Sequence, residues 1–292
     1  MFRAISLLWL SLFLCPVFGQ TALQYNLKKG EVFTIKQEAI QQIVQEMGGD
    51  TQEITNTIDG ILEFRVLAVH DTSYELAVTF KDLKLYMYSS SDGELLDINA
   101  SESPEGDVQA RIFNSMLNVP IRIVLDRCGD VLEVSGGDSL VARMADASGV
   151  KDTFTRDLMK ESLERDFGTE ALSNSYEQMT FIYPKNKIRI GDSWENEYKG
   201  KISSSNHWTL EALKGGQATI SGNASVVMDL QEASASMSLK GNRKTELSAD
   251  TDSGFLLAMK VESHSEGFSA MPEVGSEVIP TTIHSTITYK RI

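Results

Sequence analysis

The sequence LKKGEVF at residues 27–33 returns in altered form as IRIGDSW at residues 188–194. Both stretches have the same order: an apolar residue, a basic residue, any residue, Gly, an acidic residue, any residue and an aromatic residue. The Gly–acidic pair predicts a tight turn, because glycine tolerates a positive φ angle, and the aromatic side chain predicts the start of a pleated face. Each stretch opens a region of strand-type alternation, which indicates two related β-rich halves. A chance match of so loose a pattern is the alternative to internal duplication.

The residue pattern of the first half predicts long antiparallel strands. Residues 31–47 also fit a helical spacing, but a strand is preferred because Gly48-Gly49-Asp50 is a hairpin signal followed by a polar partner at 51–57. Apolar residues occupy the even positions 74, 76, 78 and 80 and then the odd positions 83, 85 and 87, so the apolar face shifts by one residue between 80 and 83. A strand can keep one face buried through such a slip only with a β-bulge, which we predict at Lys81-Asp82.

The second half contains the most regular alternation, at residues 218–230, where apolar and small residues on one face alternate with polar ones on the other. Gly222 and Ala224 are small and therefore leave room above the apolar face of this strand. A bulky neighbouring side chain is the preferred occupant of this room, and a ligand is the alternative. Residues 89–107 and 262–276 have the composition of loops, and a last strand around residues 283–289 is expected to close the sheet.

The middle of the chain predicts helices. Asp107 is expected to cap a short helix that ends before Pro120. A second helix is expected to have its N-cap at Asp138 or Ser139, a third at Asp152 and a fourth at Thr169. Apolar residues at spacings of three and four predict amphipathic helices that lie against a sheet.

We therefore predict a mainly β, α+β fold with two antiparallel β-rich halves, arranged either as duplicated curved sheets or as a half-barrel, and amphipathic helices mid-chain. The predicted segments are a signal peptide at 1–19, a first half at 20–136, a helical segment at 137–183 and a second half at 184–292.

Residues 1–19 have the basic start and short apolar run of a secretory signal peptide. Export to the periplasm or the extracellular space is expected. Lipid attachment at Cys15 is disfavoured, because Leu14 precedes it where a small residue is usual. No apolar run reaches the length of a membrane span. After cleavage Cys128 has no partner for an intramolecular disulfide.

The composition is acidic, with 41 Asp and Glu against 27 Lys and Arg and a formal net charge of -14. This charge disfavours nucleic acids and anionic membrane surfaces as partners. A lipid-like ligand or a partner protein is the expected class of partner, and the oligomeric state is left open.

Sequence motifs of catalysis, cofactor binding and metal binding are missing, so no catalytic, cofactor-binding or metal-binding residue is predicted, and no cofactor. The four histidines, His70, His207, His264 and His284, are far apart in sequence. Cys128 is interpreted as a turn residue rather than a nucleophile, because Asp126 and Asp130 flank it and oppose a thiolate. Asp92-Gly93-Glu94 matches only a fragment of a calcium loop.

The Gly–acidic–aromatic openings, the long hairpins and the turn at residues 126–129 resemble those of an uncharacterised family of exported bacterial cell-envelope proteins. This resemblance implies export and a β-rich fold, and it brings no active residues. A curved antiparallel sheet with helices on its concave face is also similar to the half-barrel lipoprotein carriers of the envelope, by architecture alone.

Two functions follow as hypotheses. The first is a non-enzymatic protein that binds an apolar or amphipathic ligand, or a partner protein, in a groove between sheet and helices. The second is an exported hydrolase with a dispersed acidic and histidine site, and a purely structural role in an assembly is the third possibility. Carboxylates or histidines that converge in a cleft would favour the hydrolase.

Overall fold

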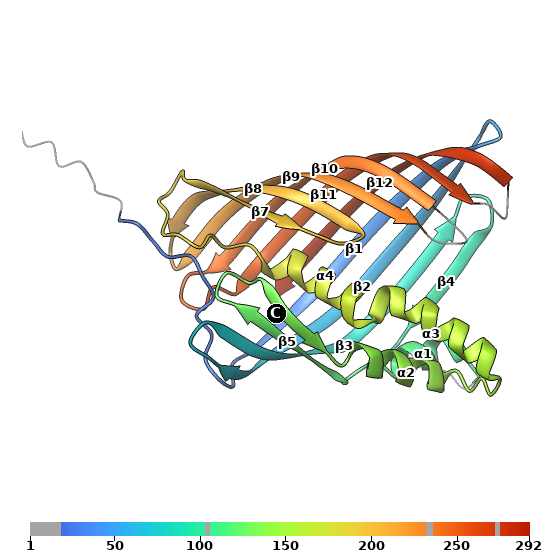
Figure 1. The fold of residues 1–292 in the computed structure, drawn as a ribbon, viewed down its shortest axis with the longest axis horizontal. Coiled ribbons are helices and arrows are strands. Elements are labelled where there is room, and N and C mark those ends of the chain that lie inside the picture. Colours follow the sequence, from blue (N-terminus) through green and yellow to red (C-terminus); the bar gives the residue numbers. More distant parts are fainter. Residues whose placement is uncertain (1–18, 103–105, 232–235, 272–274) are drawn as a thin grey trace, which may run out of the picture.

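A computed structural model describes residues 19–102, 106–231, 236–271 and 275–292. Its strands form one open antiparallel sheet in the order β6-β5-β3-β2-β1-β12-β11-β10-β9-β8-β7, with β4 paired to β3 (Figure 1). The strands are β1 Val32–Met47, β2 Asp50–Val69, β3 Ser73–Ser89, β4 Gly93–Asn99, β5 Pro120–Asp126, β6 Val131–Ser135, β7 Ser193–Tyr198, β8 Ile202–Lys214, β9 Gln217–Gln231, β10 Ser236–Asp250, β11 Leu256–Met271 and β12 Gly275–Arg291.

Helices cover one side of this curved sheet (Figure 1). They are α1 Val108–Asn114, α2 Gly137–Ala147, α3 Thr153–Phe167 and α4 Thr169–Thr180. The helix α4 contacts both β6 and β7, the two ends of the strand order. It therefore lies between the two edges of the sheet, where it protects strands that would otherwise expose unpaired backbone groups.

The two predicted halves share one sheet, because the last strand joins them. β12 pairs with β1 of the first half on one side and with β11 of the second half on the other. The predicted mainly β fold, with two antiparallel halves and helices between them in the chain, is confirmed, and the sheet remains open rather than closing into a barrel.

The two related sequence stretches adopt the same turn. Glu31 N–H donates to the carbonyl of Lys28 at 3.1 Å, and Asp192 N–H donates to that of Arg189 at 3.0 Å. In both turns the glycine has a positive φ angle, 87° at Gly30 and 90° at Gly191. The acidic side chain accepts from the backbone N–H three residues earlier in each. The prediction that these stretches are strand-opening turns is confirmed, since β1 and β7 begin at Val32 and Ser193, directly after the acidic residue of each turn.

An aromatic cluster fills the end of the molecule where the N-terminal segment enters. Phe255 stacks on Phe33 with ring centroids 4.1 Å apart and meets Phe64 edge to face at 5.5 Å. Tyr25 packs against Phe255 and against Tyr183, and its hydroxyl donates to the Thr180 carbonyl at 3.1 Å. The cluster closes this end of the curved sheet, which we call the closed end.

Several predictions about the strands are confirmed. Residues 32–47 form a strand rather than a helix, and the hairpin turn follows it at Gly48-Gly49. The pairing of β2 with β3 shifts from Ile61↔Asp82 to Leu62↔Phe80, so Lys81 is the extra residue of the predicted bulge. Trp208 covers Gly222 so closely that a Cβ atom there would lie 2.5 Å from its ring, which confirms that a bulky neighbour uses this space.

The loop predictions for residues 89–107 and 262–276 were wrong in part, because both segments contain strand residues. Residues 93–99, inside the predicted loop 89–107, form β4 on the edge of β3, and only Ile98 in this strand is buried, so its alternation is weak. Residues 262–271, inside the predicted loop 262–276, continue β11. Serine and glycine occupy its inward positions 263, 265, 267 and 269, so the sequence lacks the apolar alternation that marks a strand.

The helix predictions are confirmed in part. Asp107 caps α1 and Asp152 caps α3 through hydrogen bonds to Ala110 N and Thr155 N. The caps expected at Asp138 or Ser139 and at Thr169 are wrong, because α2 and α4 begin earlier, after Gly136 and Gly168. The expectation that every helix lies against the sheet fails for α3, which has no buried residue and packs on α2 and α4. The signal peptide and Cys15 lie outside the described residues, apart from Gly19.

Candidate ligand-binding hollow

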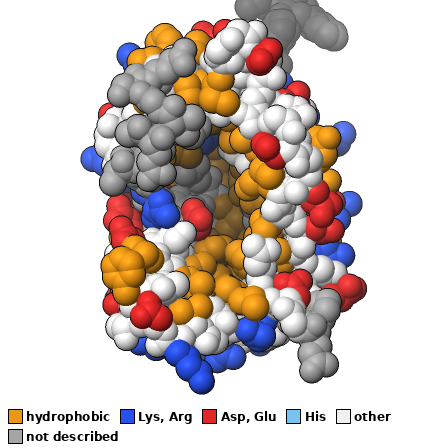
Figure 2. Space-filling view, turned by 90° about the vertical axis from the view of Figure 1, so that its right-hand side faces the viewer, with side chains coloured by type: hydrophobic (Ala, Val, Ile, Leu, Met, Phe, Trp, Pro, Cys, Tyr) orange, Lys and Arg blue, Asp and Glu red, His pale blue; other side chains and the backbone are white. Residues whose placement is uncertain are grey.

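The curved sheet encloses a hollow that opens at the end opposite the aromatic cluster. Figure 2 looks into this opening and shows hydrophobic side chains on the walls. Ala39, Ile58, Leu85, Val261 and Ile287 all point inward, yet each keeps part of its surface in contact with solvent. Because inward side chains of a filled core would be buried, their partial exposure indicates unfilled space between the walls.

One transverse row of inward side chains is polar, and we call it the polar belt. The pairings run from Asn206 to Ala224, then to Arg243, Ser263, Ser285, Gln41 and Asn56, across seven neighbouring strands. Six of these seven positions carry polar side chains: Asn206, Arg243, Ser263, Ser285, Gln41 and Asn56. Because they share one register, the belt crosses the inner face of the sheet at a single level.

The row one step closer to the closed end is apolar from β11 to β3, and Thr245 continues it on β10. Its pairings join Val261, Ile287, Ala39, Ile58 and Leu85, which we call the floor row. The row on the other side of the belt includes Val226, Ile283, Ile43 and Ile54. This row is mixed, since Gly241 and Ser265 lie between Val226 and Ile283 in register. The belt is thus a band of hydrogen-bonding groups beside the apolar floor row, an arrangement suited to the polar end of an amphipathic ligand.

Hydrogen bonds within the belt satisfy only part of its polar groups. Ser263 Oγ and Ser285 Oγ lie 2.7 Å apart, and Asn56 Nδ2 donates to Gln41 Oε1 at 3.1 Å. Arg243 Nη2 donates to Gln178 Oε1 of α4 at 3.0 Å, which links the belt to the helix that spans the sheet edges. Asn56 Oδ1 and Arg243 Nε are buried without a hydrogen-bond partner in the described chain.

Burial shifts the pKa values of Arg243 in the belt and of two tyrosines, Tyr289 of β12 and Tyr176 of α4. It lowers the pKa of the Arg243 guanidinium from its ordinary value, and it raises the pKa of Tyr289 to about 12. Burial also raises the pKa of Tyr176, whose hydroxyl has no hydrogen-bond partner among the described residues. The phenols therefore stay neutral at physiological pH, and the guanidinium is the local charge.

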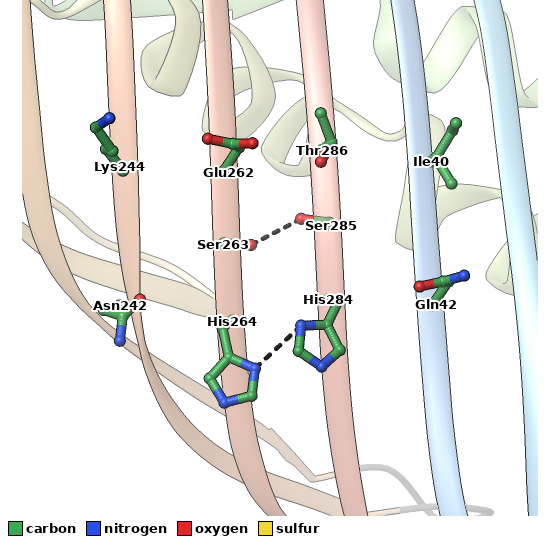
Figure 3. A pocket seen from close by; sticks show the side chains of 10 residues that line it. All are labelled: Ile40, Gln42, Asn242, Lys244, Glu262, Ser263, His264, His284, Ser285 and Thr286. Atoms are coloured by element: carbon green, nitrogen blue, oxygen red, sulfur yellow. Dashed lines mark hydrogen bonds between the residues drawn. The ribbon is translucent and has the colours of Figure 1, made fainter.

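The structure brings two of the four histidines together, but on the outer face. His264 and His284 are cross-strand partners with Nδ1 atoms 3.2 Å apart, in a shallow groove of about 350 Å³ on β10, β11, β12 and β1 (Figure 3). Glu266 Oε2 lies 4.0 Å from His264 Nε2. In the described ranges no three His, Cys, Asp or Glu side chains converge as metal ligands.

Cys128 lies at the β5–β6 turn and is buried. Burial raises the pKa of its thiol, and the carboxylate of Asp126 raises it further. The backbone N–H groups of Cys128 and Asp130 both donate to Asp126 Oδ1, so this segment is a structural turn. The position of Cys128 in a turn is confirmed. Its low reactivity stays a prediction, which burial supports because a reactive thiol needs exposure and an electropositive setting.

We expect Cys128 to react with Ellman's reagent at least about tenfold more slowly in the native protein than in urea at the same mildly alkaline pH, because burial disfavours the thiolate. The measurement uses a Cys15→Ser variant so that Cys128 is the single thiol. Equal rates in the two conditions would contradict a buried, protonated thiol.

A model described as a family of unknown function, DUF6263, matches residues 71–256. The chain belongs to this family. The matched DUF6263 region runs from the β2–β3 turn to the start of β11 and contains Asn206 and Arg243 of the belt. Membership confirms the expected resemblance to an uncharacterised family, while export stays a prediction.

Solved structures with similar folds are very distant in sequence from this DUF6263 protein. A structure described as "lipid-protein interactions in lipovitellin" has a TM-score of 0.53 and 10% identity, and the match covers 91% of this chain and 25% of lipovitellin. The chain thus spans about a quarter of lipovitellin, and the match shows a shared fold. An outer membrane channel from Pseudomonas putida F1 has a TM-score of only 0.26 and 7% identity over 92% of this chain and 97% of the channel. No curated protein matches the sequence.

The helices of the described chain are too short or too polar to span a bilayer.

The polar belt was missed at the level of sequence. Residues 240–244 read Lys-Gly-Asn-Arg-Lys, so no apolar neighbour indicates which of them points inward. Gln41 did carry a signal, since it lies between Ala39 and Ile43 on the inner face of a strand. A polar residue at an inward position between two apolar ones is the pattern that could have found the belt.

Proposed function

We propose that this protein is exported and acts without catalysis, by binding an apolar or amphipathic ligand in the hollow of its curved sheet. The observation that carries the proposal is the floor row, whose five apolar side chains point inward and remain in contact with solvent. Apolar side chains that face water in a concavity favour apolar ligands, because ligand burial removes both surfaces from water.

The expected affinity is measurable. Each methylene group buried contributes about 0.8 kcal/mol, so a chain of about ten carbons gains about 8 kcal/mol before the costs of immobilisation. Even with several kcal/mol lost to those costs, the dissociation constant falls in the micromolar to millimolar range. Direct binding assays can detect such affinities.

The chemistry of the belt supports a role without catalysis. Its polar side chains are amides, hydroxyls and one guanidinium, so the belt itself offers no carboxylate or imidazole to act as a general base. The fold shared with lipovitellin, whose structure is described in terms of lipid–protein interactions, is an architectural analogy that supports the same class of ligand.

The test is mass spectrometry of an organic extract of the purified protein, combined with titration by the neutral fluorescent probe N-phenyl-1-naphthylamine. We expect co-purified lipid-like molecules or saturable probe binding, and displacement of the probe by hydrocarbon amphiphiles. A protein that yields no extractable molecule and binds no probe would contradict the proposal and would leave a partner protein as the alternative.

A further inference from the structure

Arg243 differs from the adjacent Lys244 in the face of the sheet that it occupies and in its hydrogen-bond partners. It lies on the inner face of β10, between Ala224 of β9 and Ser263 of β11 in register. Its Nη2 donates to the neutral amide of Gln178, while its Nε is buried without a partner. In the described chain no carboxylate forms an ion pair with this guanidinium, whereas the neighbouring Lys244 on the outer face pairs with Glu246 at 2.8 Å.

An arrangement of this kind is costly for an isolated protein. Arg243 is partly buried, and its Nε is shielded from solvent. The guanidinium keeps its charge at physiological pH, and partial removal of a charge from water without a counterion is unfavourable. The chain has 41 acidic residues, yet the charged form of Arg243 gains no support from a carboxylate among those described. A negative group supplied by a ligand would satisfy both the charge and the free Nε donor.

We propose that the ligand of the hollow is an anionic amphiphile, with a carboxylate or phosphate headgroup bound by Arg243 at the polar belt and a hydrocarbon tail along the floor row. This inference rests on the proposed function, because it names the class of ligand for the same hollow. The register supports it: Val261 of the floor row is one inward position away from Ser263, the cross-strand partner of Arg243, and Ile287 is one inward position away from Ser285, the next belt residue.

The test compares amphiphiles with the same twelve-carbon tail and different headgroups. Dodecanoate, dodecyl phosphate and 1-dodecanol, each below its aggregation limit, displace N-phenyl-1-naphthylamine from wild type, Arg243→Met, Arg243→Lys and Lys244→Met. Lys244→Met is the matched control, since it removes the same charge from the adjacent residue on the outer face. Methionine at 243 keeps an unbranched apolar stem without the charge.

We expect wild type to bind at least one of the two anions about tenfold more tightly than the alcohol, since a charge-assisted hydrogen bond in a buried site contributes strongly. Arg243→Met should lose this preference and bind the alcohol within about twofold of wild type, whereas Arg243→Lys keeps much of the preference and Lys244→Met all of it. The stronger of the two anions identifies the headgroup.

A second readout separates a ligand-binding role of Arg243 from a structural one. Without ligand, Arg243→Met should have a melting temperature equal to or above that of wild type, because the substitution removes a partly buried charge that has no counterion. With dodecanoate or dodecyl phosphate, wild type should gain more thermal stability than the variant. A lower melting temperature of the ligand-free variant would assign Arg243 to the scaffold and overturn the inference.

The outcomes also distinguish this inference from the proposed function. Equal binding of both anions and the alcohol by wild type would overturn the role of Arg243 and leave the hollow as a binding site for neutral apolar ligands. If wild type binds neither the probe nor any of the amphiphiles, the proposed function fails, and the inference fails with it.

Discussion

Gly129→Ala is expected to lower the free energy of unfolding by more than about 4 kcal/mol, a loss that only a few mechanisms produce. A Cβ atom at this position would lie 1.8 Å from the carbonyl oxygen of Thr180 and 2.7 Å from Cε2 of Tyr25. Both distances are far inside van der Waals contact. The φ angle of 94° adds the strain of a left-handed conformation.

The clash is hard to relieve, because three parts of the chain meet at Gly129. Thr180 Oγ1 at the end of α4 donates to the Gly129 carbonyl at 2.7 Å, and the buried hydroxyl of Tyr25 donates to the Thr180 carbonyl at 3.1 Å. Any shift that accommodates a methyl group breaks these bonds or moves α4. Since α4 bridges the two sheet edges, the effect should spread beyond the turn.

Urea unfolding followed by circular dichroism measures this loss, with Gly30→Ala as the matched control. Gly30 has a similar φ angle of 87°, but a Cβ atom there meets nothing within 4 Å. The control should therefore lose only the left-handed strain of about 1–2 kcal/mol. If both variants lose the same amount, the close approach at Gly129 has no energetic importance.

Ala39→Trp is expected to weaken binding of the neutral probe by about tenfold or more, because an indole ring on the floor row would fill the space that the ligand uses. Ala39 lies between Ile58 and Ile287 in register, at the centre of that row. A packed core would reject the added ring at a cost of about 1–3 kcal/mol, but a hollow accepts it. The melting temperature should therefore stay close to that of wild type.

Ile40→Trp is the control for this experiment. Ile40 is the next residue of β1, points to the outer face and is 51% exposed. Its substitution adds an indole ring to the same strand without entering the hollow, so probe binding should be unchanged. Equal losses of binding in the two variants would place the probe elsewhere, and unfolding of Ala39→Trp alone would show that the floor row is already filled.

The strands with apolar alternation could be predicted from sequence, because one side of each lies on the core. The bulge at Lys81 was predictable for the same reason: a period of two leaves a visible mark when it slips. β4 and the second part of β11 were not predictable. In β4 the exposed Leu95 stands beside Leu96 and breaks the alternation, and in β11 the inward positions carry serine and glycine. Where the inner face borders a hollow rather than a core, hydrophobic periodicity no longer marks the strand.

The candidate site was less predictable than the fold. The belt residues Gln41, Asn206 and Arg243 come from strands far apart in the sequence, and only the register of the sheet brings them to one level. The pairing of His264 with His284 on the outer face could not be predicted either, because it depends on the register of β11 and β12. Motif searches cannot find a row that is defined across strands.

The central place of β12 has a consequence for the order in which the sheet can form. β1 and β11 both pair with β12, which follows every other described strand in the chain. During synthesis the hairpins of each half can form from neighbouring segments, but the halves cannot join before β12 is made. Contacts of such long sequence separation slow folding. Until they form, β1 and β11 are open edges on which another chain could add a strand, so the incomplete protein is the state most exposed to aggregation.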